Sequence, residues 1–151
     1  MKRPKTLFHI LMHIGRLLEQ KTNACLEPLK LHHGQARTLT ILMAHGPITQ
    51  ADLARGMGLR PATITNMLRP LEARELIKRY TDPKTNRAIV VSLTSDGKTL
   101  AESVQNAWSE IEDTLTKAVP SDQREATFLL LESVRDQLGG KAPDYKTYTE
   151  N

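Results

Sequence analysis

Apolar residues recur along most of the chain at three- and four-residue steps, which is the spacing of one face of a helix. The first such stripe covers residues 6–29 and the second covers residues 34–45, where Gly46 ends it. A short third helix, QADLARGM, starts behind Thr49, whose hydroxyl can cap the first turn. We therefore predict three helices in the N-terminal part of the chain.

A fourth helix follows Leu59, and it contains an unusual defect. Pro70 stands in the middle of the helical pattern, where a proline removes a backbone donor and clashes with the preceding turn. At about 100° per residue, Pro70 falls on the side opposite the apolar residues. We predict that the helix continues through Pro70 with a bend. The apolar face, which we expect in the core, comprises Ile64, Met67, Leu68 and Leu71.

The period changes from helical to alternating between Leu76 and Leu93. Two runs of β-branched or alternating residues flank the polar segment DPKTNR, which predicts a hairpin with a charged tip. Helical spacing then resumes behind Thr94, through a long apolar stripe and a last helix that Gly139 and Gly140 end. We expect the remaining tail, KAPDYKTYTEN, to be loose.

Two helices joined by a tight turn and followed by a hairpin form a winged helix-turn-helix. The predicted fold class is therefore mainly α with a small β-hairpin wing and six helices, in a single domain over residues 1–151. We expect residues 34–94 to form the winged helix-turn-helix lobe. Because long helices at both ends of a small domain need a partner surface, we expect about 6–29 and 95–140 to form a homodimer.

The charges are distributed unevenly along the chain. Residues 1–59 carry 8 basic and 3 acidic groups, residues 60–94 carry 7 and 3, and residues 95–151 carry 6 and 11. A basic front suggests an anionic partner for that part of the chain. No apolar run approaches the roughly 20 residues of a membrane span, and no signal-peptide cleavage site follows the first helix. We therefore expect a cytoplasmic protein that does not contact a membrane.

The stretch GPITQADLARGMGLRPATITNMLRPLEARELIKRYTDPKTNRAIVVSLTSDG resembles the DNA-binding core of MarR-type (multiple antibiotic resistance regulator) transcription factors. The most specific part is the hairpin pattern D-P-x-x-x-R-x-x-x-V-x-L-T-x-x-G, here Asp82 to Gly97. The resemblance implies a homodimeric regulator, typically a repressor, that binds double-stranded DNA at a pseudo-palindromic operator. It also implies release of that operator when a small-molecule effector binds.

The face of the fourth helix opposite its apolar stripe carries short polar side chains and one arginine. Arginine and asparagine can make bidentate contacts with guanine and adenine in the major groove, and cations on a hairpin tip can enter the minor groove. The predicted DNA-binding residues are Gln50, Arg60, Thr63, Thr65, Asn66, Arg69, Lys84 and Arg87. The alternatives are an ordinary solvated face, a free surface lysine at Lys84, and an ion pair between Arg87 and Asp82.

The resemblance also implies an apolar effector pocket between the dimerisation helices and the DNA-binding lobe. As candidates for its lining we name Leu17, His33, Met43 and Trp108.

Two sequence features raise the alternative of a redox- or metal-sensing regulator. Cys25 extends the apolar stripe of the first helix without a basic neighbour to activate its thiol, so we interpret it as a packing residue. His9 and His13 are four residues apart, a spacing that can chelate a metal, but no further ligand stands near them, so we predict no metal site.

A winged-helix adaptor that binds an acidic protein is a further alternative. The chain shows no nucleophile motif, phosphate loop or paired catalytic carboxylates. We therefore expect neither an enzyme nor a cofactor.

Overall fold

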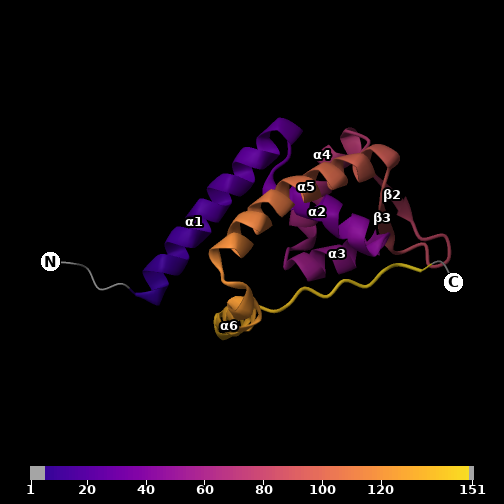
Figure 1. Ribbon diagram of the computed structural model, residues 1–151. Helices are drawn as coiled ribbons and strands as arrows, with labels where there is room; N and C mark the ends of the chain where they lie inside the picture. Colours follow the sequence, from indigo (N-terminus) through magenta and orange to yellow (C-terminus); the bar gives the residue numbers. More distant parts are fainter. Residues whose placement is uncertain (1–5, 150–151) are drawn as a thin grey trace.

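The computed structural model describes residues 6–149, which form a mainly helical fold with a small sheet (Figure 1). The order of elements is α1 (Leu7–Leu26), the 3-10 turn η1 (Glu27–Leu29), α2 (His33–His45), β1 (Ile48–Thr49), α3 (Gln50–Met57), α4 (Pro61–Ala73), β2 (Ile77–Thr81), β3 (Ile89–Leu93), α5 (Ser95–Ala118), the 3-10 turn η2 (Ser121–Gln123) and α6 (Arg124–Gln137). The predicted fold class, six helices with a hairpin wing, is confirmed.

Side chains fix where α2 and α3 begin. At α3, the hydroxyl of Thr49 accepts a hydrogen bond from the backbone amide of Asp52 at 3.1 Å, as the capping pattern predicted. At α2, His32 Nδ1 accepts from the amide of Gln35, while the Gln35 side chain accepts from the amide of His32. A histidine therefore takes the place that serine or threonine usually has in a capping box.

A third strand joins the predicted hairpin. β1 pairs antiparallel with β3, with Ile48 opposite Val91, and the sheet order is β1-β3-β2. A strand of two residues is too short to show an alternating pattern, so periodicity could not reveal it. The pairing fastens the base of the wing to the corner between α2 and α3.

The core lies where α2, α3, α4, the sheet and the first half of α5 meet. The predicted apolar face of α4 is buried, with Ile64, Leu68 and Leu71 at most 1% exposed. Pro70 is exposed, and α4 continues past it to Ala73. Beyond Pro70 in the sequence, the side chains of Leu71 and Leu76 are buried. The bend of the helix axis at Pro70 stays a prediction.

The C-terminal segment contradicts the expectation of a loose tail. After α6 the chain turns back and runs, without helix or strand, past α3 to the hairpin end of the lobe (yellow in Figure 1). Its side chains and backbone bond to α2 and to the corner that follows it. The expectation was wrong because a segment with little helix or strand preference can still be fixed by a few specific anchors.

Helices α1 and α6 present large apolar side chains to the outside. No residue of α6 is buried. An exposed apolar stripe of this size indicates a surface that another chain covers. Its members on the two helices are Leu7, Phe8, Ile10, Met12, Ile14, Leu17, Phe128, Leu129, Leu130 and Leu131. In the described part of the chain, none of the helices has the length and apolar character needed to cross a membrane.

Candidate nucleic-acid interface

The outer face of α4 is the centre of the candidate interface. Because Ile64 and Leu68 anchor one face of α4 in the core, the residues on the opposite face turn outward. The side chains of Thr63, Asn66 and Arg69 are all exposed. Arg60, the N-cap of α4, is exposed as well and makes no capping bond with its side chain. This face therefore offers hydroxyl, amide and guanidinium groups for hydrogen bonds with a partner.

Two of the predicted contact residues bind each other. Gln50 Nε2 donates a hydrogen bond to Thr65 Oγ1 at 2.8 Å, and that hydroxyl donates to the carbonyl of Pro61 at 2.9 Å. Among the described residues, Gln50 Oε1 is buried without a hydrogen-bond partner. The pair joins the first turn of α3 to α4, so it fixes the angle at which the outer face of α4 is presented.

A hollow of about 250 Å³ lies where α3, α4 and the wing meet. Gln50, Pro61 and Arg87 line it together with apolar side chains, although they are far apart in the sequence. The fold therefore brings a wing cation to the same corner as the N-terminal turns of α3 and α4. Backbone amides at helix N-termini attract anions such as phosphate.

The wing tip is organised by Asp82, a residue that is only 6% exposed. Its carboxylate accepts hydrogen bonds from the amide of Lys84 at 2.9 Å and the hydroxyl of Thr85 at 3.1 Å. The Lys84 amide, followed by the Tyr148 hydroxyl, holds the pKa of Asp82 below its ordinary value. Among residues 6–149, Arg87 makes no ion pair with Asp82, contrary to the alternative considered above. Lys84 and Arg87 are both exposed.

An ion pair ties the end of α4 to the first strand of the wing. Arg79 Nε donates to Glu72 Oε2 at 3.0 Å, and a second guanidinium nitrogen contacts the same oxygen. The hydrogen bond from Arg79 lowers the pKa of Glu72. Sequence reasoning missed this pair, because its members stand seven residues apart in two different elements.

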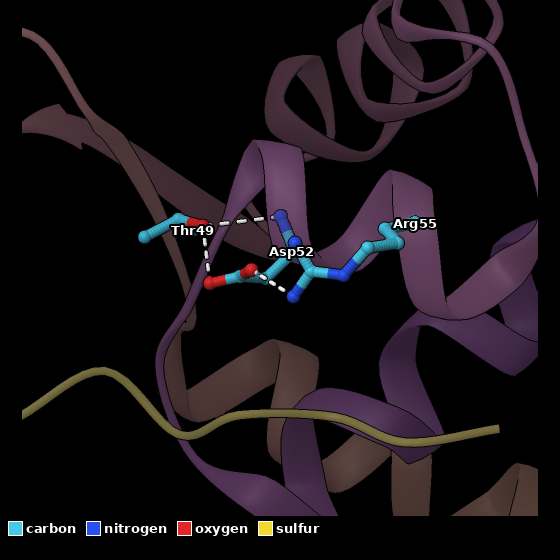
Figure 2. A network of polar contacts seen from close by, with 3 residues as sticks. All are labelled: Thr49, Asp52 and Arg55. Atoms are coloured by element: carbon cyan, nitrogen blue, oxygen red, sulfur yellow. Dashed lines mark hydrogen bonds and ion pairs between the residues drawn. The ribbon is translucent and has the colours of Figure 1, made fainter.

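The first turn of α3 carries a compact polar network (Figure 2). The Thr49 hydroxyl donates to one carboxylate oxygen of Asp52 at 2.8 Å, and Arg55 pairs with the other. Burial alone would raise the pKa of Asp52. The hydrogen bonds from Thr49 and Arg55 outweigh burial, so the pKa of Asp52 is lowered, and the positive charge of Lys146 lowers it further. Lys146 belongs to the C-terminal segment, which passes beside this network (Figure 2).

The four effector-site candidates lie in different surroundings, and the effector pocket stays a prediction. The rings of His33 and Trp108 stand 5.8 Å apart, and Trp108 and Met43 pack against the core. Trp108 Nε1 is buried, and no hydrogen-bond partner is found for it in the described part of the chain. Leu17 is 43% exposed on α1. A hollow of about 270 Å³ beside His33 is lined by other residues of α1, namely Leu18, Glu19, Thr22 and Asn23.

The thiol of Cys25 lies in an environment that disfavours the thiolate. Its Sγ donates to the carbonyl of Thr22 at 3.1 Å. Burial is the largest effect and raises the pKa of Cys25, a backbone hydrogen bond partly offsets it, and the charge of Glu110 adds a smaller rise. An unactivated thiol reacts slowly with oxidants.

Within residues 6–149, the histidines of α1 have no third ligand beside them. No group of three or more His, Cys, Asp or Glu residues that could hold a metal ion is found among residues 6–149. His9 Nδ1 instead bonds the hydroxyl of Thr6, the N-cap of α1.

Known proteins resemble this chain in sequence and in fold. Residues 31–89 match the model of the MarR family. The transcriptional repressor NicR of Pseudomonas putida is 31% identical over 99 residues, which span 66% of this chain but only 63% of that protein. The multiple antibiotic resistance protein MarR of Salmonella typhimurium is 27% identical over 142 residues, spanning 89% of this chain and 99% of that protein. The crystal structure of the S. aureus MepR–DNA complex matches with a TM-score of 0.80 and 29% identity, over 88% of this chain and 98% of that one.

Proposed function

The chain belongs to the MarR family, and from that membership we propose that it is a transcriptional repressor that binds a pseudo-palindromic operator as a homodimer. Two relatives support this proposal, since NicR is a transcriptional repressor and MepR was crystallised with DNA. We further propose that the protein acts on DNA in the cytoplasm and catalyses no reaction.

The observation that carries the proposal is the outer face of α4. Its exposed Thr63, Asn66 and Arg69 stand on a helix whose other face is locked into the core. In this proposal α4 enters the major groove, where Arg69 and Asn66 contact base edges in the bidentate manner open to these side chains. Short neighbours such as Thr63 and Ala62 let the helix backbone approach the groove closely.

The other cations would position the protein on the DNA rather than read its sequence. Arg60 at the start of α4 would contact phosphate, while Lys84 and Arg87 on the wing would follow the backbone into the adjacent minor groove. Gln50 and Thr65 would act mainly by holding α3 and α4 together, because their polar groups already engage each other.

A second copy of the chain would cover the apolar stripe of α1 and α6. Helix α6 buries no residue within the described protomer, so its apolar side chains gain by association with a symmetric partner. The dimer would place two α4 helices in successive major grooves, about one helical turn apart.

An effector would work by changing that separation. A ligand held beside His33 and Trp108, between α1, α2 and α5, would shift the population toward a state in which the two α4 helices no longer match successive grooves. Only a ligand that binds this state more tightly can lower the affinity for the operator.

Gel-shift titration with DNA from upstream of the protein's own gene tests the proposal directly. We expect saturable binding that survives an excess of random DNA, together with a dimeric mass in light scattering. Leu130→Glu should yield monomers that bind the operator weakly, while Gln105→Glu on the exposed side of α5 should leave the dimer intact. Equal affinity for upstream and random DNA would reject the proposed function.

A further inference from the structure

The C-terminal segment 141–149, called the strap below, lies along the DNA-binding lobe instead of extending away from it (Figure 1). It leaves α6 at Gly139, which adopts the left-handed conformation with φ of 82°. It then passes α3 and ends beside the hairpin of β2 and β3 (Figure 1). The strap thus spans the distance from the proposed dimerisation helices to the wing.

Tyr145 is the first anchor of the strap. Its ring packs on Gly56 of α3 so closely that a Cβ at that position would stand 2.3 Å from a ring carbon. Its hydroxyl accepts a hydrogen bond from Arg37 Nη2 at 3.4 Å, and its ring lies 5.3 Å from the ring of His45. Gly56 leaves room for the aromatic ring, whereas a Cβ at this position would clash with it.

The next two residues fix the register of the strap. Thr147 Oγ1 donates to the carbonyl of His45 at 2.7 Å, and the amide of Tyr148 donates to the carbonyl of Pro47 at 2.7 Å. Both carbonyls belong to the corner between α2 and β1. These two consecutive bonds hold the backbone at Thr147 and Tyr148 against this corner. They thereby limit the directions in which the Tyr148 side chain can point.

The Tyr148 side chain reaches Asp82, which starts the turn at the wing tip. The Tyr148 side chain hydrogen-bonds the carboxylate that also receives the amide of Lys84 and the hydroxyl of Thr85. Hydrogen bonds to a charged acceptor are stronger than those between neutral groups. Asp82 therefore connects the strap to the turn that carries Lys84 and, through Thr85, Arg87.

We propose that the strap positions the wing for DNA binding, with Tyr148 as the positioning residue that holds Asp82 and thereby the cations of the wing tip. The inference rests on the proposed function for its effect on DNA, but the ordering of the wing is independent of DNA. Without the bond from Tyr148, the wing tip samples more conformations. Fixing it on the DNA then costs conformational entropy and lowers the affinity.

Hydrogen exchange without DNA tests the ordering of the wing. We compare the full chain with Tyr148→Phe and with Tyr145→Phe, which also removes one tyrosine hydroxyl from the strap but at a site away from the wing. Exchange in the peptide that contains the Lys84 amide should rise several-fold in Tyr148→Phe only. Equal exchange in the two variants, at matched thermal stability, would overturn the inference.

Operator affinity tests the consequence for function. Tyr148→Phe should weaken binding about three- to tenfold, as expected for the loss of one hydrogen bond, and a chain ending at Lys146 should lose at least as much. The loss should disappear when Lys84 and Arg87 are both alanine, because the strap acts through them. An undiminished loss in that background would overturn the inference. Failure of the unaltered chain to bind any operator would reject the proposed function instead, and exchange would still decide on the strap.

Discussion

Gln50 on α3 and Thr65 on α4 are joined by a hydrogen bond of 2.8 Å between Nε2 and Oγ1. The Thr65 hydroxyl uses its proton as well, since it donates to the carbonyl of Pro61 while accepting from Gln50. The two helices of the helix-turn-helix are thus held together by this polar pair as well as by the apolar core.

This bond leads to a prediction about stability. Thr65→Val leaves Gln50 Nε2 without its acceptor and should lower the free energy of unfolding by about 1–3 kcal/mol. Gln50→Met removes the amide, including the buried oxygen that lacks a partner, and should cost less. The double variant should be close to Gln50→Met in urea denaturation. If the losses of unfolding free energy in the two single variants simply added up in the double variant, this would contradict a direct coupling between the two side chains.

The division between base contacts and backbone contacts gives a second prediction. Asn66→Ala and Arg69→Ala should each reduce the preference for the operator over random DNA by about 1–3 kcal/mol, because a bidentate contact with a base is lost. Arg87→Ala should weaken binding to both DNAs and reduce the slope of log K against log salt by about 0.9. Fluorescence anisotropy over a series of salt concentrations measures both effects.

Lys117→Ala provides the matched control for these variants, since it removes one exposed cation at the end of α5, far along the chain from the lobe. It should leave preference and salt slope unchanged. If Asn66→Ala and Arg69→Ala kept the full preference for the operator, the outer face of α4 would not be the reading surface.

The six helices and the core face of α4 could be predicted because apolar spacing reports directly which side of a helix is buried. Contacts between distant segments could not. Gln50 and Thr65 belong to separate elements, and Tyr148 reaches Asp82 from a tail with no periodic pattern. The sequence resemblance included Gly97 but did not explain why a glycine is needed there. In the structure, a Cβ at this position would stand 1.8 Å from the carbonyl oxygen of Leu76.

The ion pair between Glu72 and Arg79 makes part of the stability depend on pH. The bond from Arg79 lowers the pKa of Glu72 from its ordinary value of 4.5. A carboxyl with a depressed pKa in the folded state stabilises the fold above its ordinary pKa, and this contribution is lost as the pH falls through the folded pKa. The advantage of the unaltered chain over Glu72→Gln should therefore be constant near pH 7 and shrink below about pH 4.

The size of this advantage should stay below about 1 kcal/mol, since the two side chains are 38% and 20% exposed and water screens the pair. Glu102→Gln on the exposed side of α5 makes the same charge change without an ion pair among the described residues, and it serves as the control. Urea denaturation of the three proteins at several pH values measures the difference. An advantage that grew toward low pH would contradict the assigned direction.

The surroundings of Cys25 bear on whether the regulator could sense oxidants. Because burial and the charge of Glu110 raise the pKa of this thiol, little thiolate is present near neutral pH, and the thiolate is the form that reacts. We expect slow alkylation by iodoacetamide in the folded dimer, faster alkylation in urea, and operator binding that persists under mild hydrogen peroxide. Cys25→Ser should respond to peroxide as the unaltered chain does. Peroxide-dependent release of DNA that Cys25→Ser abolishes would show that the thiol senses oxidants despite its raised pKa.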